Sequence, residues 1–177
     1  EVSCGGEVAF EGIARAQIKR LGYVNPEWGF SDKSEIDVYI HKQSSEIAKL
    51  VDEDGAGDQG MMFGFACSET PEYMPMPIIL AHKLVRAIDA VRESGKLGFL
   101  RPDGKSQVSV VYEGVRPIGV SSVVLAVPHS EEVGADEVKE GLYEVVVKKV
   151  LSGYGFKFGV DSLIVNGKGV WHIGGPG

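Results

Sequence analysis

The fold is decided by residues 77–94, which read PIILAHKLVRAIDAVRES. Pro77 suits the first turn of a helix, where a backbone N–H has no helical partner in any case. Apolar residues then recur at helical spacing, and Gly95 provides a stop. The residues expected on the inner face are Ile78, Ala81, Leu84, Val85, Ile88 and Val91. The sequence therefore predicts an amphipathic helix with one face turned to the core.

Several segments around this helix have the pattern of strands. Residues 105–112 alternate polar and apolar side chains and so predict a strand, and residues 118–127 are predicted to form another strand. Ahead of the helix, residues 61–67 form a compact apolar run that predicts a buried strand. Residues 36–41 alternate in the manner of a half-buried strand.

Two further helices and a hairpin complete the predicted elements. Residues 11–21 form a short amphipathic helix that a following glycine ends, and residues 136–151 form a second long helix. Segments 162–165 and 170–173 flank Asn-Gly-Lys-Gly at 166–169, which is a strong hairpin signal. The inner face of the second long helix is expected to carry Val138, Leu142, Val145, Val146 and Val150.

These elements predict an α+β fold. From residue 61 their order is β-α-β-β-α-β-β, with hairpin-type links, so helices should cover one face of a mixed or antiparallel sheet. Residues 1–50 form part of a separate N-terminal α/β unit, and residues 51–60 a glycine-rich connecting loop. Residues 61–177 then form the main lobe.

Composition and charge narrow the class of protein. The 177 residues are 44% hydrophobic and 24% charged, which is typical of a globular chain. A net charge of -7 repels phosphate backbones and anionic lipid, so nucleic acid and membrane are not expected partners. Two cysteines, Cys4 and Cys67, form no CxxC motif, which fits a reducing, cytoplasmic compartment.

The segment Gly55-Ala56-Gly57-Asp58-Gln59-Gly60 matches G-x-G-x-x-G letter for letter. A dinucleotide site needs a hydrophobic strand before this motif and a helix after it, and neither is present. Asp58 would also repel a bare pyrophosphate and suits a cation better, either a metal or a substrate ammonium. An ordinary glycine-rich turn is the alternative.

A second charged segment runs from Arg101 to Gln107 and reads RPDGKSQ. It is not a P-loop, because the preceding glycine has the wrong spacing and Pro102 lacks the amide that a phosphate cradle uses. Asp103 can accept hydrogen bonds from ribose hydroxyls or an adenine amino group, and Lys105 can pair with phosphates. A solvated charged turn is the alternative.

Two further residues have local interpretations. His129 and the acidic residues after it are expected to form a helix cap. Trp171 is expected either to lie in the core or to present a surface that stacks on adenine.

Taken in order, several motifs resemble those of the bacterial-type S-adenosylmethionine synthase family. The motifs are KQS (42–44), DGAGDQGMMFG (54–64), MPMPI (74–78), AH (81–82), LRPDGKSQV (100–108), HSEE (129–132) and IGGP (173–176). The resemblance implies two-layer α/β lobes and transfer of the adenosyl group of ATP to the sulfur of L-methionine, with release of pyrophosphate and phosphate. It also implies two Mg²⁺ and a K⁺ as cofactors, and a homodimer or homotetramer with active sites at the subunit interface.

The family pattern also implies roles for individual residues. Lys105 and Asp58 would be catalytic, with Lys105 on the phosphates and Asp58 on the methionine ammonium. The residues implied for ATP are Asp103, Gly104, Lys105, Val170 and Trp171, and those for methionine are Gln43, Asp58 and Glu1. None of these residues is implied as a metal ligand. Val170 stands where the family has Arg, whereas Trp171 keeps the aromatic character of that position.

The resemblance covers about half of a family chain, so the C-terminal lobe is expected to lie outside these residues. The family's G-H-P-D-K motif and its later lysine-bearing glycine-rich loop have no counterpart here. The chain is therefore predicted to be a methionine adenosyltransferase if those motifs belong to the same polypeptide. The alternative is a non-catalytic nucleotide-binding fragment or a partner subunit of a full-length synthase.

Overall fold

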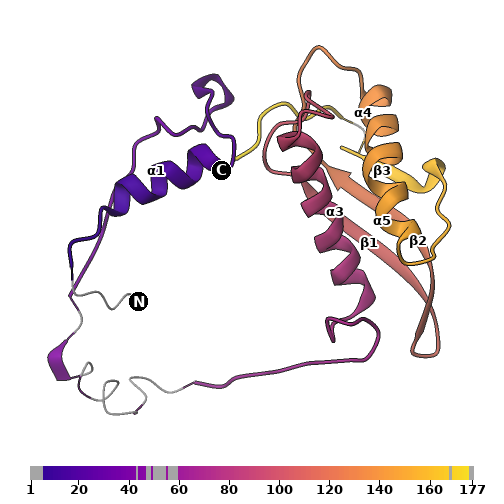
Figure 1. Cartoon of the computed structure of the whole chain (residues 1–177), viewed down its shortest axis with the longest axis horizontal. Coiled ribbons are helices and arrows are strands. Elements are labelled where there is room, and N and C mark those ends of the chain that lie inside the picture. Colours follow the sequence, from indigo (N-terminus) through magenta and orange to yellow (C-terminus); the bar gives the residue numbers. More distant parts are fainter. Residues whose placement is uncertain are drawn as a thin grey trace.

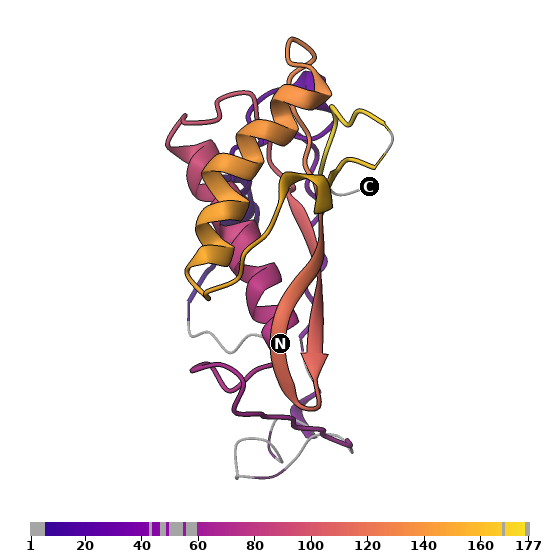
Figure 2. The ribbon, with the colours of Figure 1, turned by 90° about the vertical axis from the view of Figure 1, so that its right-hand side faces the viewer.

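The chain folds into one two-layer lobe, with a separate N-terminal helix beside it (Figure 1). The computed structural model describes residues 6–42, 44–46, 49, 55, 60–167 and 169–175. In the lobe, helices lie on one face of a three-stranded sheet, as the side view shows (Figure 2). The predicted α+β class is confirmed.

The sheet has the order β1-β2-β3 and is mixed. Strands β1 (Lys105–Glu113) and β2 (Arg116–Ala126) are antiparallel, with Lys105 opposite Ala126, and confirm the strands predicted at 105–112 and 118–127. The short strand β3 (Leu163–Val165) follows the 3-10 turn η3 (Val160–Ser162) and pairs with β2 in parallel. Since β1 begins at Lys105, this residue lies at one end of the sheet.

Helix α3 (Met76–Glu93) is the predicted central helix, ended by Gly95 at a φ of +72°. Most of its buried side chains recur every four residues, at positions 76, 80, 84 and 88, so the buried face of the helix is rotated from the predicted one. The buried residues are Met76, Ile79, Leu80, Leu84 and Ile88. Ile78, expected inside, is 38% exposed. Adjacent apolar residues make the periodicity ambiguous, and packing against β1 selects the face.

The second long helix contains a π-helical segment. Helix α4 (Ala135–Leu142), η2 (Tyr143–Val147) and α5 (Lys148–Ser152) follow one another without a break. A π turn holds one extra residue, which shifts the inner face by one position in the second half. The buried residues are Val138, Leu142, Val146, Val147 and Leu151. Val145 and Val150, expected inside, are only partly buried.

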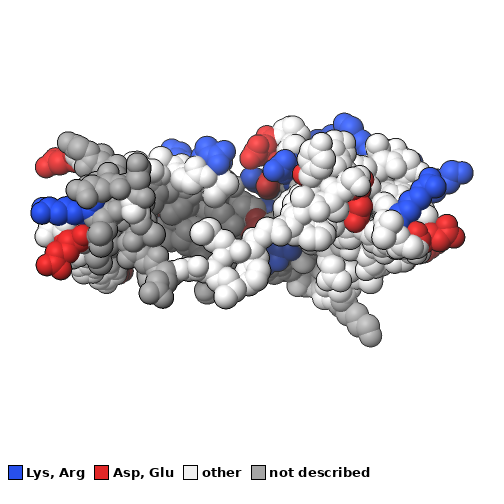
Figure 3. All heavy atoms as spheres, turned by 90° about the horizontal axis from the view of Figure 1, so that it is seen from below, with Lys and Arg blue, Asp and Glu red and all other residues white. Residues whose placement is uncertain are grey.

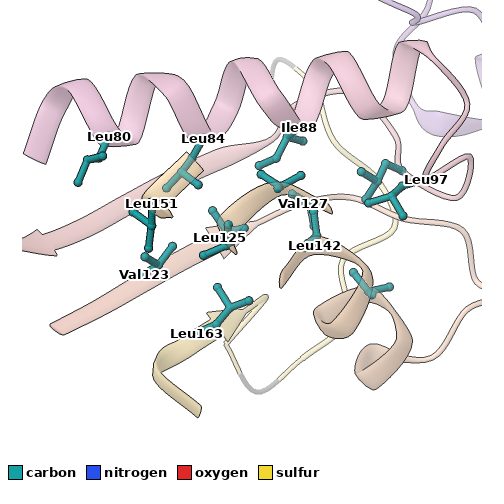
Figure 4. Packing of buried hydrophobic residues seen from close by; sticks show 14 of the residues in the cluster. Leu80, Leu84, Ile88, Leu97, Val123, Leu125, Val127, Leu142, Leu151 and Leu163 are labelled. Atoms are coloured by element: carbon teal, nitrogen blue, oxygen red, sulfur yellow. The ribbon is translucent and has the colours of Figure 1, made fainter. Parts of the chain in front are cut away.

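Both helices and the inner face of the sheet contribute to one hydrophobic core (Figure 4). Leu80, Leu84 and Ile88 project from α3 toward Val123 and Leu125 of β2. Leu163 closes the core from β3. This core holds the end of β1 in a fixed position, which matters for the site described below.

Two predicted strands are wrong. Residues 36–41 and 61–67 are not strands in the described chain. Tyr39 is 79% exposed, and Met62 is 94% exposed. A strand is stable only when a neighbour pairs with its backbone, and no described segment pairs with either of these.

Of the predicted hairpin at 162–173, the first strand is confirmed as β3, but the second strand and the hairpin pairing are wrong. Asn166 and Gly167 have the positive φ values of a tight turn, 53° and 61°, but residues 170–173 form no strand. The Asn166 side chain instead pairs with Val127, accepting from its N–H at 2.8 Å and donating to its C=O at 3.0 Å. Asn166 therefore satisfies the backbone beyond β2, and the chain leaves the sheet.

Outside the lobe, helix α1 (Phe10–Arg20) confirms the predicted N-terminal helix, with Gly22 beyond its end at a φ of +93°. None of its side chains is buried, so its apolar stripe has no core to join. Among the described residues, no helix is long and apolar enough to cross a membrane. Seen from below, cationic and anionic side chains are interspersed along the molecule (Figure 3).

Glu69 fixes the beginning of α3. Its carboxylate accepts from Met76 N–H at 2.9 Å and from Tyr112 O–H at 2.6 Å, and these hydrogen bonds hold the pKa of Glu69 below its usual value. Burial, followed by the Glu69 carboxylate, raises the pKa of Tyr112 to about 12.

Glu69→Gln should lower the hydrogen-exchange protection of the Met76 amide by about two- to fivefold at neutral pH. In the unmodified chain the same loss should occur as the pH falls through the lowered pKa of Glu69, because the bonds require the carboxylate. Glu113→Gln, on β1, is the control and should leave the amide unchanged. Equal protection in both variants would contradict this role of Glu69.

Candidate functional site

The segment from Arg101 to Gly104 leads directly into β1 and is held on both sides. Arg101 N–H donates to the Pro128 carbonyl at 2.8 Å, and the preceding Leu100 pairs with His129 in a single antiparallel β-bridge. A Cβ on Gly104 would lie 3.0 Å from Cγ2 of Ile88. Glycine thus lets this loop lie directly on the core.

The loop brings Asp103, Lys105 and Trp171 together. Asp103 has a φ of +85°, a region that Asp tolerates better than most residues. Its Oδ2 lies 3.3 Å from Lys105 Nζ, and that ammonium lies 4.4 Å from the centroid of the Trp171 ring. Lys105 is 62% exposed, so its charge remains accessible to a ligand.

Residues 171–175, within the last described segment, lie alongside this loop. His129 N–H donates to the Trp171 carbonyl at 2.9 Å, and Gly175 N–H donates to Asp103 Oδ2 at 3.2 Å. Trp171 Nε1 donates to the Ile173 carbonyl, which orients the indole. Trp171 is half-buried and is not part of the core cluster, so the core alternative is wrong.

His129 is a buried structural residue, not a helix cap. It is 1% exposed, and helix α4 begins only at Ala135. Its ring meets the His172 ring edge to face at 4.9 Å, and its carbonyl lies 2.9 Å from His172 Nδ1. The predicted cap is therefore wrong, because the buried backbone around His129 joins the two loops of the site.

The arrangement provides three chemical functions on one open surface. Lys105 offers a cation for phosphate, Trp171 a flat aromatic face, and Asp103 a carboxylate whose position the Gly175 amide fixes. An aromatic face beside a cation and a carboxylate suits a nucleotide, which carries a base, hydroxyl groups and phosphates.

Comparison with known proteins decides the family. Residues 53–171 match the model of the S-adenosylmethionine synthetase central domain. The chain belongs to the S-adenosylmethionine synthetase family. It is 39% identical to the S-adenosylmethionine synthase of Microcystis aeruginosa, 41% to that of Trichormus variabilis and 40% to that of Crocosphaera subtropica. Each match covers 99% of this chain and 48% of the relative, so the chain spans about half the length of these curated relatives.

The family resemblance inferred from the sequence is thus confirmed, and the individual residue roles stay predictions. In this synthetase-family chain, the structure brings together four of the residues predicted to bind ATP, namely Asp103, Gly104, Lys105 and Trp171. The fifth, Val170, precedes Trp171 in the chain and has a side chain that is 63% exposed. The predicted methionine residues Glu1, Gln43 and Asp58 lie outside the described residues. The domain limits at 50 and 60 also stay predictions.

Sequence reasoning missed Trp28 as part of this site. The indole lies 5.0 Å from the guanidinium of Arg101, measured to the ring centroid. The run Asn25-Pro26-Glu27-Trp28-Gly29 carries clear turn signals. Nothing in those signals indicates contact with Arg101, which is distant in sequence.

Gly174→Ala should disrupt the junction between the two loops. A Cβ there would lie 2.6 Å from Pro128 Cγ and 2.9 Å from the Pro102 carbonyl oxygen. We expect a loss of about 1–3 kcal/mol in the free energy of unfolding, measured by chemical denaturation. Gly159→Ala is the control, because a Cβ at Gly159 meets nothing within 4 Å. Equal stability of the two variants would show that the loops are not packed as described.

Proposed function

We propose that this chain forms the central part of a methionine adenosyltransferase, which makes S-adenosylmethionine from ATP and L-methionine and releases pyrophosphate and phosphate. The observation that carries the proposal is the convergence of Asp103, Lys105 and Trp171 in a chain of this family. The curated relatives are named S-adenosylmethionine synthases, which supports the same activity here.

In the proposed reaction, a lone pair of the methionine sulfur attacks C5′ of ATP. A sulfur–carbon bond forms, the bond from C5′ to the triphosphate oxygen breaks, and its electron pair leaves with the triphosphate. The sulfur becomes a sulfonium cation, so no proton is transferred in this step. Hydrolysis then divides the triphosphate into pyrophosphate and phosphate. The protein must chiefly align the two reactants and stabilise charge on the leaving group.

The described residues support two parts of this reaction. The exposed ammonium of Lys105 is proposed to pair with the triphosphate, and the Trp171 ring beside it is proposed to stack on the adenine ring. Asp58 is proposed to hold the methionine ammonium, with Gln43 and Glu1 beside the amino acid. ATP and L-methionine are accordingly the proposed ligands.

Mg²⁺ and K⁺ stay proposed cofactors. No group of three or more His, Cys, Asp or Glu side chains within the described residues is placed to hold a metal ion. We therefore derive no step through a metal from these residues. A homodimer or homotetramer with active sites between subunits also stays a proposal, and light scattering of the purified protein would test the number of subunits. A location in the cytoplasm is proposed as well.

The decisive assay measures S-adenosylmethionine formed from ATP and L-methionine by the purified polypeptide, after its intact mass has been determined. Product formation supports the proposal. ATP binding without product, at a mass of 19.0 kDa, would support the nucleotide-binding fragment or partner subunit instead. Absence of both ATP binding and product would contradict both the synthase and the nucleotide-binding fragment.

A further inference from the structure

The loop of residues 23–32, here termed the Trp28 loop, is a rigid turn that touches both loops of the candidate site. Asn25 Oδ1 accepts from Glu27 N–H at 3.0 Å, and the 3-10 turn η1 (Pro26–Trp28) ends at Gly29 with a φ of +80°. Asp32 N–H donates to the Tyr23 carbonyl at 2.8 Å and closes the loop at its base. The position of Trp28 is therefore set by local hydrogen bonds.

The Trp28 loop lies against residues 173–175. A Cβ added at Gly175 would lie 3.4 Å from Phe30 Cβ and 3.5 Å from Tyr23 Cε1, and one added at Gly29 would lie 3.7 Å from Ile173 Cγ2, so the two backbones are separated by little more than one methyl group. The Tyr23 and Phe30 rings meet edge to face at 5.3 Å. Burial, followed by the nearby Asp103 carboxylate, raises the pKa of Tyr23.

Arg101 makes contacts with three segments of the chain. Its guanidinium donates to the His172 carbonyl and stacks on Trp28, while its backbone N–H donates to Pro128. No carboxylate in the described part of the chain pairs with it. Arg101 is thus a link between the loop before β1, the segment 171–175 and the Trp28 loop.

We propose that Trp28 is a positioning residue for the nucleotide site: its indole holds the Arg101 guanidinium on the His172 carbonyl and so fixes Asp103 and Lys105 relative to Trp171. The inference rests on the proposed function for its ATP readout. A second readout, the exchange of backbone amides, does not depend on nucleotide.

Trp28→Ala should weaken ATP binding by about five- to tenfold, because a partly desolvated cation–π contact contributes that much. Trp28→Phe keeps an aromatic face and should stay within about twofold of the unmodified chain. Arg101→Lys should also weaken ATP binding, although it keeps the positive charge, since an ammonium lacks the planar guanidinium that stacks on an indole and donates hydrogen bonds at once. Tyr39→Ala, an exposed aromatic outside these contacts, is the control and should change nothing.

Hydrogen exchange on the full chain, without ATP, tests the same proposal independently. In Trp28→Ala the amides of Arg101, His129 and Gly175 should exchange faster, while those of the core strand β2 should not. The unmodified rates should return in Trp28→Phe. Unchanged exchange at all three amides would overturn the proposal, whatever the ATP result.

Faster exchange with unaltered ATP affinity would also overturn it, because Trp28 would then order the loops without serving the nucleotide. Failure of the unmodified chain to bind ATP would contradict the proposed function instead. The exchange data would still decide whether Trp28 fixes the loops.

Discussion

Lys105→Ala should lower kcat/KM for S-adenosylmethionine formation by about 100-fold, as expected when one group that stabilises a leaving anion is removed. The variant loses the ammonium beside Trp171, and it also leaves Asp103 without its cation, 3.3 Å away in the unmodified chain. That carboxylate would then repel the triphosphate. Initial rates of product formation by the full-length polypeptide, with ATP varied, provide the measurement.

The folded state should tolerate Lys105→Ala, because an ion pair with a 62% exposed lysine contributes little to stability. Lys96→Ala is the matched control: it removes the same charge from an exposed position in the turn after α3 and should retain full activity. Activity of Lys105→Ala equal to that of Lys96→Ala would show that Lys105 does not act on the phosphates.

Leu84→Ala should lower the free energy of unfolding by about 3 kcal/mol. Leu84 is fully buried and projects from α3 into the cluster shared with β2 and α5 (Figure 4), so truncation leaves a cavity that a rigid core cannot fill. Urea denaturation followed by circular dichroism measures the loss. Val115→Ala, in a 90% exposed position of the turn between β1 and β2, is the control and should change stability by less than about 0.5 kcal/mol.

Leu84→Ala should also impair nucleotide binding. Gly104 lies on Ile88, one helical turn further along the same face of α3, so the loop before β1 depends on this core. Stability of Leu84→Ala equal to that of Val115→Ala would show that α3 does not pack as described.

The strands illustrate why part of the fold could be predicted and part could not. Residues 105–112 were predicted because polar and apolar side chains alternate along them, and residues 118–127 were predicted as a further strand. Residues 36–41 and 61–67 have comparable local patterns and form no strand in the described chain. The difference is the presence of a partner, since β1 and β2 pair with each other across a short turn.

The candidate site divides in the same manner. Asp103, Gly104 and Lys105 could be selected from one short segment, because their side chains suit a nucleotide and the motif resembles a known family. Trp28 and His129 could not be assigned their contacts, because each depends on segments far away along the chain. The π turn in the second long helix likewise changes which valines are buried without a local signal that distinguishes Val147 from Val145.

The helices, the two long strands, the α+β class and the family can be predicted from the amino-acid sequence, because they depend on local periodicity, on start and stop residues and on contiguous motifs. The buried face of α3, the departure of residues 170–173 from the sheet and the contacts of Arg101 with three separate segments become apparent only in the folded chain. Burial and strand pairing are properties of two surfaces in contact. The second surface, in each of these cases, comes from a distant part of the chain.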